Sequence, residues 1–263
     1  MKILKTYNEL FEAIVKKLDF CDQDLTELPE LPDSLKKLIC SNNKLIELSE
    51  LPDSLNVLDC PNNKITELPE LPDSLNVLDC SDNKISELPE LPKTLEYLYC
   101  SYNNIKKLPE LSSSLKELYC TYNQLTKLSE LPSSLEKLYC GNNKITEIPE
   151  LPSNIEILGC SDNQLKELPE LPSNLKKLYC TNNNISELPE LPSNIEKLYC
   201  YDNNISELPE LPSSLRFLKC KNNKLPYDDL IGYWEWFHEY YPIHYPTKYK
   251  RFLARKKIKK FNL

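Results

Sequence analysis

Residues 91–110 read LPKTLEYLYCSYNNIKKLPE, and the same pattern begins again at residue 111. Ten such units of twenty residues run from residue 31 to about residue 230. Each unit carries one cysteine, from Cys40 to Cys220, and one asparagine three residues later, from Asn43 to Asn223. A fixed period of this length predicts a repeat architecture in which each unit packs on its neighbours.

The first half of each unit has the pattern of a short strand. In the segment from Leu95 to Cys100, alternation places Leu98 and Cys100 on one face and Tyr97 and Tyr99 on the other. The asparagine that follows favours a bend, and asparagines stacked in successive units would hydrogen-bond between coils. Two prolines in each return limb, as in residues 88–92, favour an extended, polyproline-like backbone.

The pattern L-x-x-L-x-C-x-x-N-x-[LI] resembles the consensus of leucine-rich repeats over residues 18–226. With LPxLP on the return limb and a cysteine ladder, it is similar to the short, 20-residue bacterial type. Similar repeats occur in secreted effectors of pathogenic bacteria and in proteins of large DNA viruses. The resemblance implies an α/β repeat fold: a solenoid with a parallel concave sheet of about eleven short strands and an extended convex side.

A solenoid exposes its core at both ends, so the sequence should provide caps. Residues 1–22 fit an N-terminal helical cap and a first edge strand, in which Phe20 replaces the ladder cysteine and Cys21 lies off the ladder. Residues 23–226 form the solenoid. Residues 227–263 fit a C-terminal cap helix with aromatic residues at helical spacing, followed by a basic tail.

The composition argues against an enzyme. The chain has three glycines and two histidines in 263 residues, and it lacks the motifs of phosphate-binding loops and zinc sites. We therefore expect no catalytic residue, no metal, no cofactor and no small-molecule substrate. Some bacterial effectors join similar repeats to a ubiquitin ligase, but only 38 residues follow Leu225 and none is cysteine.

The ten ladder cysteines could bind a soft metal or form disulfides, but at inward positions of a dry core they pack as small hydrophobic residues. So many unpaired thiols favour a reducing compartment, and we expect a cytoplasmic protein. A column of glutamates on the return limb, from Glu30 to Glu210, fits a solvated face better than a calcium site.

Aromatic residues gather at outward positions of the predicted concave sheet, where Tyr buries a large area and keeps a polar tip. The alternative is that tyrosine was copied by duplication or favours strands. We expect a monomer that binds an unknown protein or peptide here, without chemistry of its own. The candidate partner-binding residues are Tyr97, Tyr99, Tyr102, Tyr119, Tyr122, Tyr139, Ile157, Gly159, Tyr179, Tyr199, Tyr201 and Phe217.

Gly159 interrupts the tyrosine column, which predicts a dent in the concave face. Ile157 would form part of its floor, and Tyr139 and Tyr179 would bound it. Lys137 and Lys177 would favour a ligand with a negative charge near an apolar anchor. A Trp at position 159 would fill this dent without disturbing the fold.

The basic tail provides a second hypothesis. The net charge is −8, yet residues 248–260 contain eight basic residues and no acid. The solenoid would then be a spacer scaffold, and the tail would recruit it to nucleic acid or an anionic membrane. The alternative for the tail is a helix that folds back on the acidic solenoid.

Overall fold

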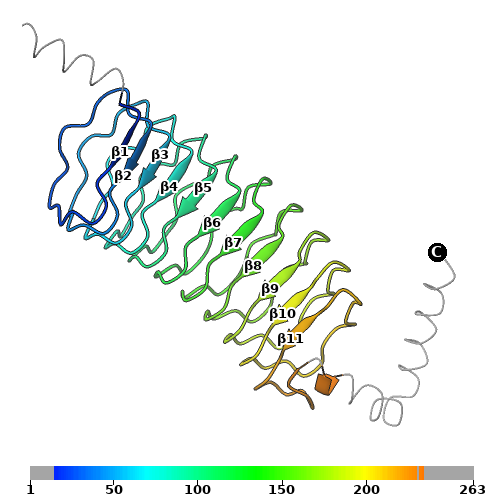
Figure 1. The fold of residues 1–263 in the computed structure, drawn as a ribbon. Coiled ribbons are helices and arrows are strands. Elements are labelled where there is room, and N and C mark those ends of the chain that lie inside the picture. The colour runs from blue at the N-terminus through cyan, green and yellow to red at the C-terminus, as the bar shows by residue number, and fades with distance from the viewer. Residues whose placement is uncertain (1–14, 230, 234–263) are drawn as a thin grey trace, which may run out of the picture.

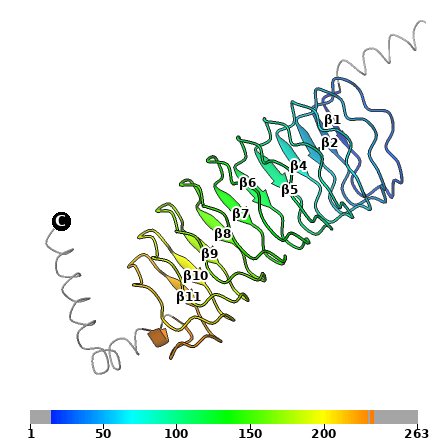
Figure 2. The same cartoon turned by 180° about the vertical axis from the view of Figure 1, so that it is seen from behind.

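The computed structural model describes residues 15–229 and 231–233. Within these residues the chain forms one parallel sheet of eleven strands, each of three residues, whose order in the sheet is the order in the chain. Figures 1 and 2 show the strands side by side along one side of the stack of coils. The strands are β1 (Lys17–Asp19), β2 (Lys37–Ile39), β3 (Val57–Asp59), β4 (Val77–Asp79), β5 (Tyr97–Tyr99), β6 (Glu117–Tyr119), β7 (Lys137–Tyr139), β8 (Ile157–Gly159), β9 (Lys177–Tyr179), β10 (Lys197–Tyr199) and β11 (Phe217–Lys219).

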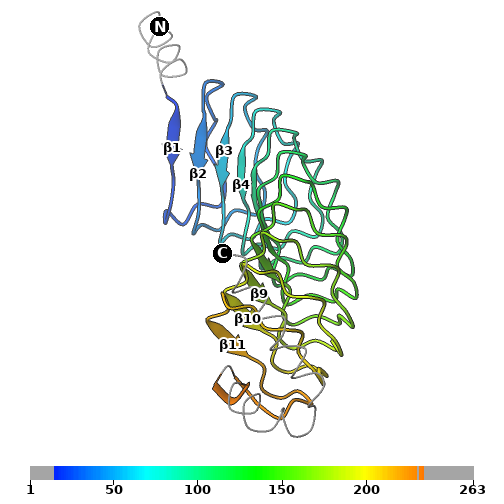
Figure 3. The same cartoon turned by 90° about the vertical axis from the view of Figure 1, so that its right-hand side faces the viewer.

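The solenoid is an arc with the strands on its inner side (Figure 3). Each strand pairs with the next at a shift of twenty residues, so Leu98 of β5 lies beside Leu78 and Leu118. Equivalent side chains therefore form columns across the sheet. The predicted solenoid with a parallel concave sheet and extended return limbs is confirmed.

The core consists of these columns. The central leucine of each strand from β2 to β10 is fully buried or nearly so, and all ten ladder cysteines are fully buried. Burial raises the pKa of the ladder thiols, to about 12 for Cys140. All eleven cysteines are free, and Cys21 is half-buried with its Sγ 2.9 Å from Ser41 Oγ. The packing prediction for the cysteines is confirmed.

The asparagine ladder joins the coils, as predicted. The Asn163 side-chain amide donates to the carbonyls of Cys140 and Cys160, both at 3.1 Å, and its oxygen accepts from the Ile145 backbone N–H at 2.9 Å. Each such asparagine satisfies backbone groups of two coils that the turn leaves without a strand partner. The sequence analysis did not predict a second ladder, which lies before the strands, whereas the asparagines lie after them. In this ladder a hydroxyl such as that of Ser54 donates to the Asp33 and Leu35 carbonyls of the preceding coil.

The residue before each ladder asparagine has a left-handed backbone. Its φ lies between 51° and 57° in every unit from Asn42 to Asn222. Asn and Asp tolerate this region well, and bulky residues do not. Eight of the ten positions are Asn or Asp, whereas Tyr102 and Tyr122 occupy the other two.

The last coil is covered by the chain that follows it. Cys220 N–H donates to the Asp228 carbonyl at 2.9 Å, and the rings of Tyr227 and Tyr233 lie edge to face with centroids 5.2 Å apart. Both tyrosines are buried. Sequence analysis predicted a cap within residues 227–263 but did not identify Tyr227 and Tyr233 as the residues that cover the last coil.

The predicted N-terminal helix, most of the predicted C-terminal helix and the basic tail at 248–260 lie outside the described residues. The predicted edge strand is present as β1, which pairs with β2. No helix among residues 15–229 and 231–233 has the length and apolar character needed to span a membrane.

Candidate functional site

Three tyrosines on successive strands form a continuous row of contacting rings at the centre of the concave face. The ring centroids of Tyr99 and Tyr119 are 5.0 Å apart, and those of Tyr119 and Tyr139 are 4.6 Å apart. Each ring is half-buried by its neighbours. The parallel register causes this arrangement, because it holds equivalent side chains about one strand spacing apart.

A second aromatic pair lies nearer the C-terminal end of the sheet. Tyr179 and Tyr199 meet edge to face with centroids 5.3 Å apart. The Lys219 ammonium lies 5.2 Å from the Tyr199 ring centroid, and the Lys197 ammonium lies 5.1 Å from the centroid of Phe217. These cation–π contacts make this end of the face basic and aromatic. Sequence analysis did not include the two lysines among the candidate binding residues.

The prediction of a dent at Gly159 is wrong. A Cβ atom built on Gly159 would lie 2.6 Å from Tyr139 Cδ1, so the Tyr139 ring leans over the glycine and fills the space. Gly159 and Ile157 are both buried. The space that a side chain at position 159 would occupy is therefore filled by the Tyr139 ring. A Trp at position 159 would collide with that ring.

The prediction that Lys137 and Lys177 attract a negatively charged ligand group is wrong for Lys137. The Lys137 ammonium lies 2.8 Å from the Glu117 carboxylate, which also accepts a hydrogen bond from the Tyr99 hydroxyl at 3.3 Å. Lys137 is thus paired within the face rather than free to attract a ligand anion. Two further lysine–glutamate pairs join successive coils just before their strands begin, at Glu96–Lys116 and Glu156–Lys176.

The phenols of the face stay protonated at neutral pH. Burial, and then the Glu117 carboxylate, raise the pKa of Tyr99 to about 12. Burial also raises the pKa of Tyr119, Tyr139 and Tyr179. The hydroxyls of Tyr119, Tyr139 and Tyr179 can therefore donate hydrogen bonds to a ligand, whereas the Tyr99 hydroxyl already donates to Glu117.

The N-terminal part of the face is acidic. Asp59 and Asp79 are partners in the register of β3 and β4. Burial, followed by the neighbouring Asp79 charge, raises the pKa of Asp59. The concave face thus changes along the solenoid from carboxylates, through stacked phenols, to lysines over aromatic rings.

Tyr102 and Tyr122 form a separate pair on the rim, just beyond the strands. Their rings stack at 4.3 Å with an interplanar angle of 10°, and the residues are 53% and 47% exposed. Of the other predicted site residues, Tyr97 on β5 and Tyr201 after β10 are half-buried, and Phe217 on β11 is exposed. The twelve predicted residues therefore form two ring clusters, a rim pair and separate positions rather than one continuous patch.

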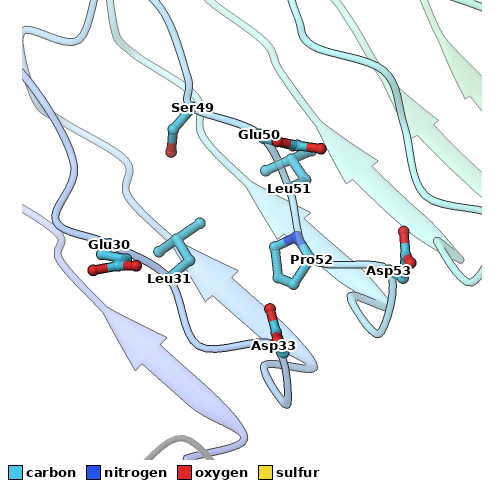
Figure 4. A pocket seen from close by; sticks show the side chains of 8 residues that line it. All are labelled: Glu30, Leu31, Asp33, Ser49, Glu50, Leu51, Pro52 and Asp53. Atoms are coloured by element: carbon cyan, nitrogen blue, oxygen red, sulfur yellow. The ribbon is translucent and has the colours of Figure 1, made fainter.

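The return limbs carry a shallow acidic hollow. A hollow of about 430 Å³ lies between two successive limbs near the N-terminal end, lined by Glu30, Leu31, Asp33, Ser49, Glu50, Leu51, Pro52 and Asp53 (Figure 4). Its acidic residues repeat from one limb to the next. In the part of the chain that the structure describes, no group of three His, Cys, Asp or Glu residues is placed to hold a metal ion.

Sequence profiles identify the repeats. The profile described as "Leucine Rich repeats (2 copies)" matches residues 73–113, 93–133, 113–153 and 133–173, and the profile "Leucine Rich Repeat" matches residues 174–195. No curated protein sequence matches the chain. With the twenty-residue period and the observed solenoid, the chain belongs to the leucine-rich-repeat family.

Two solved structures of bacterial proteins share this fold. YopM from Yersinia enterocolitica WA-314 has 31% sequence identity to this chain and a TM-score of 0.58, over 80% of this chain and 65% of YopM. The functional domain of InlJ from Listeria monocytogenes, which includes a cysteine ladder, has 23% identity and a TM-score of 0.54, over 81% of this chain and 60% of that one.

A third structure holds such repeats in a complex. FLRT2 repeats in an octameric complex of Latrophilin 3, Unc5D and FLRT2 match with a TM-score of 0.62 and 23% identity, over 77% of this chain and 80% of that one. At this identity the similarity concerns the fold.

Proposed function

We propose that the protein is a non-enzymatic interaction module that binds a protein or peptide on its concave face. The observation that carries this proposal is the half-exposed row of contacting rings of Tyr99, Tyr119 and Tyr139 on a regular sheet. Stacked rings have little side-chain freedom left to lose on binding, and they offer apolar area together with protonated hydroxyls. The presence of FLRT2 repeats in a protein complex is consistent with such a role.

The test compares matched variants of the two sides of the solenoid. Proteins recovered by affinity capture would be purified, and their binding to the solenoid measured. A Tyr119→Ala, Tyr179→Ala double variant should lose at least about thirtyfold in affinity, the effect of one typical hot spot. The return-limb double variant Glu150→Ala, Glu170→Ala should bind unchanged. Equal losses in both variants, with both folded, would refute the proposal.

The basic tail supports a second candidate function. Eight basic residues without an acid between positions 248 and 260 favour binding to nucleic acid or an anionic membrane. Binding through the tail should weaken steeply as salt rises, whereas binding through the tyrosines should change little. Measurement of affinity at two salt concentrations, with and without residues 248–263, separates these possibilities.

We also propose that the protein acts in a reducing compartment, the cytoplasm. Eleven free cysteines, ten of them fully buried, support this location, because such chains fold poorly where disulfides form.

A further inference from the structure

The rim pair of Tyr102 and Tyr122 stands at positions that disfavour tyrosine. Their φ angles are 56° and 52°, in the left-handed region where the other eight units place Asn or Asp. A bulky residue there is strained, because its Cβ atom crowds the following carbonyl oxygen. Residues held in such conformations, with half of their surface exposed, are candidates for binding.

The same positions form a side-chain ladder elsewhere in the solenoid. Asn62 donates to Asn42 at 2.6 Å, Asn182 donates to the Asp162 carboxylate at 2.7 Å, and Asn222 donates to the Asp202 carboxylate at 2.6 Å. Within the ten regular units, Asp162 and Asp202 each receive a donor from an asparagine of an adjacent unit.

Asp82 is the exception. Its neighbour on one side, Asn62, donates to Asn42, and its neighbour on the other side is Tyr102. Within residues 15–229 and 231–233, no hydrogen bond or ion pair reaches the Asp82 carboxylate. The two tyrosines therefore interrupt the ladder and leave a carboxylate that can accept from an external donor.

The geometry adds an aromatic wall beside this carboxylate. Tyr122 covers one face of the Tyr102 ring, so the other face looks toward the preceding unit, in which Asp82 holds the equivalent position. Asp82 is close enough to contribute, after burial and Tyr122, to raising the pKa of Tyr102. Because Asp is shorter than Tyr, the two residues form a step with an acidic floor and an aromatic wall, about one strand spacing wide.

The group that fits this step is a guanidinium. It is planar and always charged, it stacks on aromatic faces, and its parallel N–H groups match a carboxylate. A lysine ammonium would gain the charge but not the stacking.

We propose that Tyr102, Tyr122 and Asp82 form a binding site for an arginine side chain of the protein partner. The guanidinium stacks on the free face of Tyr102 and donates to the Asp82 carboxylate, while Tyr122 supports the ring from behind. This inference rests on the proposed interaction function and names one residue type that the partner presents at the rim.

The test uses the full chain and a simple probe. The peptide acetyl-Gly-Arg-Gly-amide would be titrated into protein with isotope-labelled tyrosine rings, and the ring signals of Tyr102 and Tyr122 followed by NMR. We expect these signals to shift and saturate with a dissociation constant on the order of millimolar. The citrulline peptide, which is neutral but nearly isosteric, and the lysine peptide should each bind at least about fivefold more weakly.

Two variants and one control localise the effect. Tyr102→Asn restores the residue type of the ladder, so it should fold, and the Tyr122 signal should no longer respond to the peptide. Asp82→Asn should weaken binding about fivefold to tenfold, since a charge-assisted bond is lost. Asp202→Asn, at a position where Asn222 already supplies the donor, should leave binding unchanged.

The outcomes separate this site from the wider function. Equal responses to the three peptides, unchanged binding in Asp82→Asn, or no response at high peptide concentration would each overturn the arginine site. If the concave tyrosine variants still lose partner binding, the interaction function stands without it. A confirmed arginine site together with unchanged partner binding in those variants would instead overturn the concave-face proposal.

Discussion

Replacement of Asn163 by alanine tests whether the asparagine ladder holds neighbouring coils together. Without this side chain, the Ile145 N–H loses its acceptor in a buried position. The carbonyls of Cys140, Cys160 and Ser161 each lose the donor from Asn163. Each of the three keeps one other donor, from Asn143, Asn183 and the Asn142 backbone N–H respectively. The variant therefore leaves one unsatisfied donor and three weakened acceptors.

The expected cost follows from this count. A buried donor without a partner costs about 1–3 kcal/mol, and each lost carbonyl bond costs about 0.5–1.5 kcal/mol. We expect Asn163→Ala to lower the free energy of unfolding by about 3–5 kcal/mol. Because the coils on either side of the break would be less strongly coupled, the transition should also broaden or split.

Urea unfolding followed by circular dichroism measures this loss. The matched control is Asn174→Ala, which removes one exposed bond to the Ser153 carbonyl at 3.0 Å. The control should lose no more than about 1 kcal/mol. Equal losses in the two variants would refute the assignment of the ladder as the joint between coils.

Three further predictions concern thiols, Gly159 and pH. Thiol reagents should modify half-buried Cys21 first, and early reaction of several ladder thiols in the folded protein would show that the core is open. Gly159→Ala should destabilise the protein by about 1–3 kcal/mol, because the new methyl group meets Tyr139, and the cost should shrink in a Tyr139→Ala background. Stability should be constant between neutral pH and pH 9 and fall between pH 9 and 12: the ordinary thiol pKa of 9.0 rises to about 12 at Cys140, and the ordinary phenol pKa of 10.0 rises to about 12 at Tyr99, so the unfolded chain ionises first. A urea midpoint that stays level up to pH 11 would contradict this explanation.

The period predicted much of the fold because it constrains the backbone directly. A shift of twenty residues predicts which strands pair, in what register, and which residues face the core, so the burial of Leu98 and Cys100 followed from alternation alone. The bonds of the asparagine ladder followed from the stacking of equivalent turns. These features depend on position within the unit and little on the identity of the neighbours.

The directions of surface side chains could not be predicted in this way. The tilt of Tyr139 over Gly159 and the pairing of Lys137 with Glu117 depend on rotamers that neighbouring units select together. One signal was overlooked. A column that holds Asn or Asp in eight units and tyrosine in two identifies Tyr102 and Tyr122 as exceptions from the sequence alone.

Site-specific photo-crosslinking tests the central claim, that a protein partner binds the concave face. A benzophenone amino acid would replace either Tyr179 on the concave face or Glu170, which is exposed on the return limb. The two residues are nine positions apart in the sequence. A crosslinker at position 179 tests the concave face, and one at position 170 tests the return limbs. We predict that the purified partner is crosslinked from position 179 and not from position 170. Crosslinking from position 170, or from neither position while the complex is intact, would contradict the proposed binding face.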